Sequence, residues 1–415
     1  MDMNNSRKMI TIPYIIGDGI GPDIWKAAQI VLNTAIEKAY HGKSQVQWLE
    51  VLAGEKAFQK VGKYLPDETL ETLRKYKVGI KGPLTTPVGG GFQSLNVILR
   101  KELDLYACQR PVHWFKGLPS PLINPQGLDV VLLRENTEDV YSGIEFGANS
   151  SKNLLLLKIL KNKFPSKFQC LRFTKEVGID LKPISKEGSQ RLVRAAVKWA
   201  IENKRNKVTL IHKGNIMKYT EGAFLQWGYQ LIEEEFPDYA YTQQQWQQTK
   251  NAYGENNANR EKDMALQSGK ILINDMIADV AFEQAISQPT SFDVIAATNL
   301  NGDYLSDAFA ALAGGVGISP GGNINYETGM ALFEANHGSA VSLANQNKAN
   351  PSSLILSGSM MFRFLSLTEA ANLIIRGIKA TIRRGEVTFD LYSQITGNTL
   401  LGTQEFAEAV SASID

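Results

Sequence analysis

Four aspartates are spaced so that they could hold a metal ion. Asp275 and Asp279 lie four residues apart in the apolar segment 271–282, and Asp303 and Asp307 repeat that spacing. Residues four apart share one face of a helix, where carboxylates are costly to bury without a cation or hydrogen-bond donors. Such a set of oxygen ligands suits Mg²⁺ or Mn²⁺, with the other coordination positions left to water and substrate. The alternative is that these aspartates are helix caps and surface acids.

A glycine-rich segment could bind an anion. Residues 82–91 read Gly-Pro-Leu-Thr-Thr-Pro-Val-Gly-Gly-Gly and precede a predicted helix that opens with Ser94 and Asn96 and continues to Arg100. The start of a helix favours anions because its first N–H groups are unpaired, and Asn96 and Arg100 share a face. Ser94 could instead be only an N-cap, and Arg100 only a solvated residue.

Two further arginines, Arg110 and Arg134, end predicted strands. Open α/β sheets place ligands at strand ends, and three converging guanidinium groups would suit a ligand with several carboxylates. Taken singly, each arginine is more often a surface ion-pair partner than a ligand-binding residue, and spacing alone does not establish convergence.

Candidate acid, base and cofactor residues stand apart from these groups. Lys213 follows the apolar segment 208–212, and burial or a nearby cation could lower its pKa. Tyr141 could act as an acid beside it. His337 precedes Gly338, which would let a cofactor approach the backbone closely. The segment 17–22 does not match the dinucleotide-binding motif G-x-G-x-x-G, because proline occupies the position of the third glycine. It is therefore interpreted as a structural turn.

Alternating strands and helices are expected to position these residues. The expected strands are 11–16, 46–52, 77–81, 107–110, 130–133, 208–212 and 293–298, and the expected helices are 23–39, 67–76, 185–203, 221–235 and 354–365. This alternation predicts an α/β fold. Residues 139–182 interrupt it and predict an inserted β-rich clasp. The Gln/Asn-rich segment 243–263 is interpreted as a solvated connection near a helix end.

The composition of the chain narrows the functional classes. With 415 residues, 43% of them hydrophobic, the chain can form two or three domains, and a net charge of +2 gives no reason to expect nucleic acid or an anionic membrane as partner. Two isolated cysteines and a polar start favour a reducing, cytoplasmic location. Neither a nucleophile elbow, a Walker loop nor an H-E-x-x-H motif occurs, which disfavours hydrolase and P-loop functions.

Taken together, five segments resemble the bacterial-type isocitrate dehydrogenases, within the isocitrate/isopropylmalate family of β-decarboxylating dehydrogenases. The segments are 82–91, 94–96, 134–136, 212–217 and 299–304, and the similarity extends over about residues 10–412. The resemblance implies a non-Rossmann cofactor site and a homodimer joined by the clasp 139–182. It also implies a large α/β domain (1–105 and 316–415) and a small α/β domain (106–138 and 183–315).

The resemblance also implies roles for individual residues. Ser94, Asn96, Arg100, Arg110 and Arg134 match the positions that bind the carboxylates of isocitrate, Tyr141 matches the catalytic acid and Lys213 the base, and Asp279, Asp303 and Asp307 match the metal ligands. Lys213 and Asp279 match residues that the partner subunit contributes, so each active site would be shared. The implied reaction is metal-assisted oxidation of isocitrate to a β-keto acid, loss of CO₂ and protonation to 2-oxoglutarate.

The cofactor segment departs from the NADP-type pattern of the family. Ser342, Leu343, Phe389, Ser393 and Gln288 stand where NADP-linked bacterial relatives carry lysine, tyrosine, tyrosine, arginine and arginine. Because an unpaired phosphate is costly to desolvate, this pattern favours NAD over NADP, unless another base such as Lys348 compensates. Ser342 is also not the acidic residue typical of NAD-linked members. The full expected cofactor set is Leu84, Thr85, Asn215, Glu334, His337, Gly338, Ser339, Ala340, Ser342, Leu343, Asn350, Phe389 and Ser393.

Other functions remain open at this stage. A sister dehydrogenase for isopropylmalate, homoisocitrate or tartrate is disfavoured by Ser94 and Asn96. A non-catalytic regulatory subunit would lack some of the acid, base or metal residues, all of which are present. Phosphorylation of Ser94 would place a phosphate among three arginines and displace the substrate.

Overall fold

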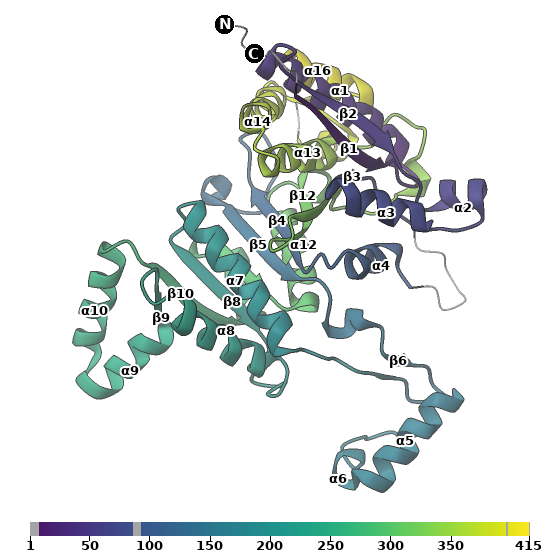
Figure 1. Cartoon of the computed structure of the whole chain (residues 1–415). Coiled ribbons are helices and arrows are strands. Elements are labelled where there is room, and N and C mark those ends of the chain that lie inside the picture. The colour runs from purple at the N-terminus through teal and green to yellow at the C-terminus, as the bar shows by residue number, and fades with distance from the viewer. Residues whose placement is uncertain (1–7, 86–92, 396, 415) are drawn as a thin grey trace, which may run out of the picture.

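The computed structural model describes residues 8–85, 93–395 and 397–414, and an 11-stranded sheet forms its centre. The strand order is β2-β1-β3-β13-β12-β4-β5-β11-β8-β10-β9 (Figure 1). The strands are β1 (Lys8–Ile15), β2 (Ser44–Glu50), β3 (Val78–Lys81), β4 (Ala107–His113), β5 (Asp129–Glu135), β8 (Lys207–His212), β9 (Ala240–Thr242), β10 (Ile271–Ile277), β11 (Val294–Ala297), β12 (Pro320–Asn325) and β13 (Met330–Ala335). The α/β fold predicted from the sequence is confirmed.

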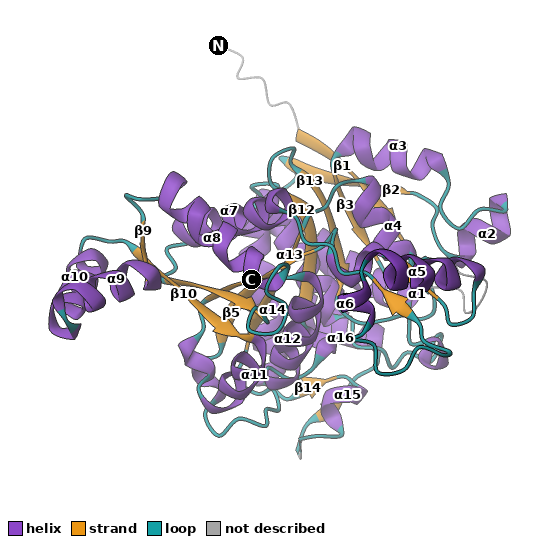
Figure 2. Cartoon of the chain, turned by 90° about the horizontal axis from the view of Figure 1, so that it is seen from below, coloured by secondary structure: helices purple, strands orange, loops and turns teal. Residues whose placement is uncertain are grey.

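Antiparallel pairing is confined to the middle of the sheet. β13 pairs with β12, β12 with β4 and β4 with β5 in antiparallel fashion, whereas the pairs on either side are parallel. Parallel neighbours need crossover connections, and helices supply these on both faces (Figure 2). The central strands therefore join two parallel α/β halves.

Four apolar clusters fix the helices on the sheet. The largest cluster contains α1 (Gly21–Tyr40), α13 (Ser352–Phe364), α14 (Thr368–Arg383) and α16 (Thr403–Ala412) against β12 and β13. The second contains α7 (Lys186–Glu202) and α8 (Glu221–Glu235), the third α11 (Ala278–Ser287) and α12 (Asn299–Leu312), and the fourth α3 (Asp67–Tyr76) and α4 (Leu95–Glu102). The shorter elements are α2 (Glu55–Val61), α15 (Phe389–Tyr392), β14 (Glu386–Val387) and β15 (Thr399–Leu400).

The register of the central strands decides which side chains share a face. Cys108 pairs with both Asn323 and Arg134, so Arg110, Arg134 and Asn323 lie on one face of the sheet. Val131 packs in the cluster of α7, whereas Leu132 packs in the cluster of α12. The arginines and α12 therefore lie on one face, and α7 lies on the other.

Two predictions about the inserted segments are wrong. The strands in residues 139–182 are only the short β6 (Glu145–Phe146) and β7 (Ile179–Asp180), while α5 (Ser151–Lys163) and α6 (Pro165–Phe168) supply most of the regular structure of this projection (Figure 1). The Gln/Asn-rich segment forms α9 (Gln243–Tyr253) and α10 (Glu255–Gln267) rather than an irregular connection, because Thr242 and Gln245 make a reciprocal capping box. The division into domains remains a prediction.

The turn 17–22 serves the fold, as the sequence suggested. The carboxylate of Asp18 accepts the backbone N–H groups of Glu55 (2.9 Å) and Thr85 (2.8 Å). A Cβ on Gly17, whose φ is +86°, would lie 2.6 Å from the carbonyl oxygen of Pro83. Among the described residues, no helix has the length and apolar character needed to cross a membrane.

Candidate active site

Three buried guanidinium groups gather above the middle of the sheet. Arg110 and Arg134 come from the neighbouring strands β4 and β5, and Arg100 from the last turn of α4. Arg134 is 1% exposed. Burial lowers the pKa of Arg134, and the positive charges of Arg100 and Arg110 lower it further. The convergence that spacing could not establish is therefore present in the folded chain.

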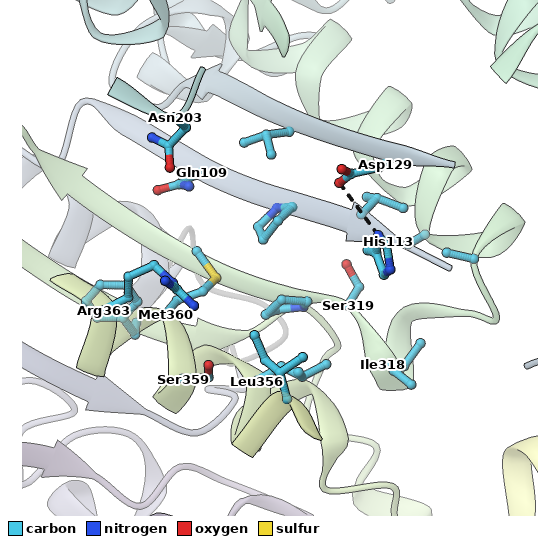
Figure 3. Close-up of a pocket in the computed structure, with 18 of the residues that line it drawn as sticks. Gln109, His113, Asp129, Asn203, Ile318, Ser319, Leu356, Ser359, Met360 and Arg363 are labelled. Atoms are coloured by element: carbon cyan, nitrogen blue, oxygen red, sulfur yellow. Dashed lines mark ion pairs between the residues drawn. The ribbon is translucent and has the colours of Figure 1, made fainter. Parts of the chain in front are cut away.

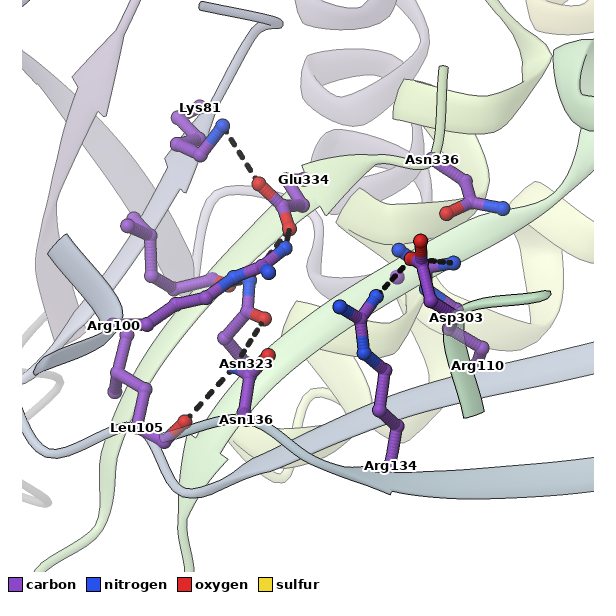
Figure 4. Close-up of polar contacts among 12 residues, drawn as sticks. Lys81, Arg100, Leu105, Arg110, Arg134, Asn136, Asp303, Asn323, Glu334 and Asn336 are labelled. Carbon is purple, nitrogen blue, oxygen red and sulfur yellow. Dashed lines mark hydrogen bonds and ion pairs between the residues drawn. The ribbon is translucent and has the colours of Figure 1, made fainter. Parts of the chain in front are cut away.

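Helix α12 presents its two aspartates to these arginines. Asp303 pairs with Arg134 and lies 3.9 Å from Arg110 (Figure 4). Arg110 also lies 3.3 Å from Asp307. The hydroxyl of Tyr141 donates to Asp303 at 2.8 Å. Burial acts to raise the pKa of Asp303, but Arg134, Tyr141 and Arg110 outweigh it and hold the pKa below its ordinary value. Asp303 is therefore a charged carboxylate at neutral pH.

Burial and the hydrogen bond to Asp303 keep the phenol of Tyr141 protonated, although its ring stacks against Arg134. The guanidinium carbon of Arg134 lies 4.8 Å from the ring centroid of Tyr141. Burial raises the pKa of Tyr141, and although Arg134 opposes this effect, the bond to Asp303 adds to it. A protonated phenol at this position can donate a proton to a reacting group.

Several donors of this cluster are buried without a partner in the part of the chain that the structure describes. These donors are Nε of Arg100, Nε of Arg110 and Nη2 of Arg134. One acceptor, Oδ1 of Asn96, is likewise buried without a partner among the described residues. Unpaired buried charged donors are costly, and a polyanionic ligand would satisfy them. Ser94 starts α4 without a side-chain capping bond, so its hydroxyl is not used as a cap. Residues 86–92 of the glycine-rich segment lie outside the described residues.

Neighbouring polar residues that the sequence analysis missed hold the arginines in place. Asn299 accepts from Nε of Arg134 at 2.7 Å, and Ser306 accepts from Arg110 at 2.6 Å. Both residues lie on α12, within one turn of Asp303. The sequence did contain a signal for these two residues, because the polar residues of the segment 299–307 recur at helical spacing.

A separate polar pair forms at the end of β8. Lys213 pairs with Asp279, in the first turn of α11, and this bond lowers the pKa of Asp279. The described residues hold no group of three or more acidic, histidine or cysteine side chains that could bind a metal. The three aspartates proposed as metal ligands therefore divide into Asp303 with Asp307 on one helix and Asp279 beside Lys213.

The expectation that Asp275 shares a helix face with Asp279 is wrong. Asp275 lies in β10, whereas Asp279 lies in α11. Asp275 accepts from the Tyr229 hydroxyl at 2.7 Å and lies 3.2 Å from Nε2 of His212. These donors satisfy it within the fold, so it is a structural carboxylate.

Comparison with known proteins places this geometry in a family. The profile described as Isocitrate/isopropylmalate dehydrogenase matches residues 11–410. The chain is 52% identical over 403 residues to a Staphylococcus epidermidis protein named Isocitrate dehydrogenase [NADP], covering 97% of this chain and 95% of that protein. The chain belongs to the isocitrate/isopropylmalate dehydrogenase family. The resemblance inferred from the sequence is thereby confirmed.

Further relatives agree with this assignment. A Streptococcus mutans protein named Isocitrate dehydrogenase [NADP] is 49% identical over 96% of this chain and 94% of its own. The crystal structure of isocitrate dehydrogenase from Methylococcus capsulatus superposes with a TM-score of 0.78 at 36% identity, covering 98% of this chain and 99% of that one. The fold is therefore that of the family along nearly the whole chain.

The preference for NAD is contradicted by these relatives. Proteins about half identical to this chain are named as NADP enzymes. The prediction rested on uncharged residues at Ser342, Leu343, Phe389 and Ser393, and such a comparison gave too little weight to cations nearby. Lys348 lies 5.8 Å from the ring centroid of Phe389, so this segment does carry a positive charge.

The structure brings together part of the expected cofactor set. Thr85 donates to the Ser339 hydroxyl at 2.8 Å, and Asn350 donates to Asp390, next to Phe389, at 3.0 Å. Burial lowers the pKa of His337. Residues 338–343 follow β13, with Gly338, Ala340 and Ser342 exposed, while Leu84 is buried and Asn215 is exposed in the loop after β8. The cofactor roles of these residues remain predictions.

Glu334 is a special case within that set, because it faces the arginines. Its carboxylate pairs with Lys81 at 2.6 Å and Arg100 at 3.0 Å, and it accepts from Asn323 at 2.7 Å (Figure 4). Burial acts to raise the pKa of Glu334, but the charges of Lys81 and Arg100 hold it well below its ordinary range. The sequence pattern did not single out Lys81, although it ends a predicted strand directly before the segment 82–91.

The substitution Glu334→Gln should lower the free energy of unfolding by about 3 kcal/mol at neutral pH, because it leaves two buried cations without their counter-charge. A carboxyl group whose pKa is depressed on folding stabilises the protein above its ordinary pKa of 4.5. That contribution is lost as the pH falls toward the folded-state value, so the difference between variant and wild type should shrink in acid. Denaturant unfolding at several pH values measures it. Glu369→Gln, which removes an exposed ion pair with Arg376, is the control and should change stability little.

Proposed function

We propose that this chain is an isocitrate dehydrogenase that uses NADP to convert isocitrate to 2-oxoglutarate and CO₂. The observation that carries the proposal is the cluster of Arg100, Arg110 and Arg134, each with a buried guanidinium nitrogen lacking a partner in the described chain. Three guanidinium groups match a substrate with three carboxylates. The names of relatives about half identical to this chain support the substrate and the cofactor.

The aspartates fit a divalent metal ion. Asp303 and Asp307 are four residues apart on α12 and both lie within 4 Å of Arg110, so they face the same space. Hard carboxylate oxygens are the ligands that Mg²⁺ and Mn²⁺ prefer. Asp279 of the partner subunit would complete the set, since the described part of one chain holds no group of three ligands. A metal ion bound there would act as a Lewis acid on the substrate's oxygen atoms, and a bound nicotinamide would supply the hydride acceptor.

The residues of the chain then have defined tasks. The arginines hold the carboxylates and orient the substrate. Lys213 accepts the proton of the 2-hydroxyl, directly or through water, and Tyr141 donates a proton to the carbon that loses CO₂. Tyr141 is suited to this step because burial and Asp303 keep its hydroxyl protonated.

The active site would be shared between two subunits. Lys213 pairs with Asp279 on one part of the chain, whereas Tyr141 pairs with Asp303 on another. The clasp also exposes large apolar side chains that a second copy would cover: Leu154, Leu155, Ile159, Phe164 and Phe173. Light scattering should give the mass of a dimer, and a monomer that retains full activity would rule out sharing.

The direct test is an absorbance assay for reduced nicotinamide with Mg²⁺ and a panel of substrates. Isocitrate with NADP should be the preferred pair. Turnover of isopropylmalate, homoisocitrate or tartrate instead would favour a sister dehydrogenase. No turnover with any substrate, despite bound isocitrate, would favour a regulatory subunit.

Lys348→Ala should lower kcat/KM for NADP about tenfold, because a charge-assisted contact to the 2′-phosphate is lost. The value for NAD, which lacks that phosphate, should change little. Calorimetric binding of 2′,5′-ADP gives a readout independent of turnover, and Lys198→Ala on the exposed side of α7 is the control. An equal loss for both cofactors would exclude a role of Lys348 in phosphate binding.

A further inference from the structure

A cavity of about 630 Å³ lies on the face of the sheet opposite to the active-site arginines. Gln109 and His113 of β4 line it (Figure 3), as does Pro111. These three residues alternate along the strand with Arg110, whose side chain therefore lies on the other face. Val131 of β5 lines it in the same way and alternates with Leu132. The cavity and the active site therefore share strands but occupy different faces.

The cavity exists because two helices on this face leave β4 uncovered. Helix α7 packs on β5 and β11, and α13 packs on β12 and β13. Trp199 near the end of α7 lines the cavity, as do Leu356 and Met360 of α13. Protein interiors are normally closely packed, and a hollow of this size between two apolar clusters lies within the range of small-molecule sites, about 300–1,000 Å³.

The chemistry of the walls indicates the class of ligand. Much of the surface is apolar, including Phe333, Leu356 and Met360. Three cationic side chains also line it: Arg205, which pairs with Asp129, and Arg363 and Lys379. Arg363 donates to the amide oxygen of Asn372 at 2.7 Å, and Lys379 lies 5.3 Å from the ring centroid of Phe115, but neither has a carboxylate partner within the described chain.

The acidic residues of the cavity do not balance the charges of Arg363 and Lys379. Asp129 pairs with Arg205 at 3.0 Å and lies 3.7 Å from Nδ1 of His113. Glu202 is exposed at the end of α7. The unmatched positive charge therefore lies on the α13 and α14 side, next to the apolar wall.

We propose that this cavity is a regulatory site for a small amphipathic anion, with an aromatic or aliphatic body against α13 and an acidic group toward Arg363 and Lys379. A carboxylate, phosphate or sulfonate on such a body would gain charge-assisted contacts that the fold leaves open. A bound ligand would fix the spacing between α7 and α13.

A ligand in the cavity would weaken the binding of isocitrate through the strands that the cavity shares with the active site. β4, β5 and β12 carry Arg110, Arg134 and Asn323 on their opposite face. In the arrangement that leaves the cavity open, Arg134 is engaged by Asp303. A ligand that stabilises this arrangement competes energetically with isocitrate and raises its KM, a consequence that rests on the proposed function.

Anilinonaphthalene sulfonate is a suitable probe, because it combines an aromatic body with a sulfonate and fluoresces in apolar sites. It should bind the wild-type protein at one site per chain, and saturating NADPH should leave this signal in place. Met360→Trp should strongly weaken the signal because the indole narrows the apolar side of the cavity, and Arg363→Gln should weaken binding about tenfold. Arg383→Gln, on an exposed part of α14 outside the cavity, is the matched control and should change nothing.

Activity measurements separate this site from the proposed reaction. The probe should raise the KM for isocitrate at least about fivefold in the wild type and not in Met360→Trp, whose KM without probe stays normal. Probe binding that survives both cavity substitutions, or that NADPH displaces completely, would overturn the proposal. So would a normal KM in the presence of bound probe. Absence of isocitrate turnover without any probe would instead refute the proposed function and leave the binding result standing.

Discussion

A Lys213→Ala protein and a Tyr141→Phe protein should each be nearly inactive, whereas a refolded mixture of the two should regain about a quarter of the wild-type activity. Loss of a general acid or base lowers the rate about 10²- to 10⁴-fold. In a mixed dimer, one site carries both substitutions and the other carries neither. Half of the dimers in an equal mixture are mixed, and each has one intact site of two. Turnover of isocitrate before and after joint refolding measures the effect.

Two matched substitutions control for general damage. Tyr304→Phe changes an exposed tyrosine on α12, and Lys218→Ala changes an exposed lysine near Lys213, and both proteins should keep normal activity. Phenylalanine also retains the ring that stacks with Arg134, so Tyr141→Phe should fold normally. If the refolded mixture stays as inactive as its components while mixed dimers are present, the two residues act within one chain and the shared site is refuted.

The alternation of strands and helices could be predicted, because the burial of each element requires a recognisable pattern of apolar residues in the sequence. The strands β8 and β11 are covered by helices, so nearly all of their residues are buried and most of them are apolar. The clasp was less predictable, since its helix α5 is covered little within one chain and shows weak apolar periodicity. In the proposed dimer a second subunit would cover this helix, and a single chain does not reveal that contact.

Asp275 and Asp279 show the limit of spacing as a guide to a site. The segment 271–282 is apolar throughout, and periodicity cannot distinguish a buried strand from a helix in so short a run. The chain changes from β10 to α11 between the two aspartates, so the four-residue interval has no helical meaning there. For Asp303 and Asp307 the same interval lies within a continuous helix, and the inference that they share a face was correct.

Cofactor preference was misjudged for a related reason. Uncharged residues at matched positions, such as Ser342, show that particular contacts are missing, but the field at a phosphate depends on every nearby cation. Lys348 lies close to the ring of Phe389, although the two residues are 41 positions apart in the sequence, and only the folded chain reveals this proximity.

Arg134→Met should lower kcat/KM for isocitrate by about 10³-fold, chiefly through a higher KM. Arg134 is 1% exposed, bonds to Asn299 and Asp303, and retains one buried nitrogen without a partner in the described chain. Removing one member of such a buried charged set costs about 2–5 kcal/mol, which corresponds to a large loss of substrate affinity. Arg194→Met, which removes a surface pair with Glu235, should leave the kinetics unchanged.

The same substitution should also change how activity depends on pH. Among the groups that lower the pKa of Asp303, Arg134 contributes most, and burial opposes it. Without the guanidinium, the largest contribution that lowers the pKa of Asp303 is lost, so this pKa rises and a larger fraction of the carboxylate is protonated in mild acid. A protonated carboxyl group is a poor metal ligand, so the Mg²⁺ concentration needed for half-maximal activity should increase more steeply in Arg134→Met than in the wild type as the pH falls. Metal titrations of both proteins across the acidic range measure this difference. Parallel pH profiles would mean that Arg134 binds substrate without controlling the charge of Asp303, and an unchanged KM would remove the guanidinium cluster from the substrate site altogether.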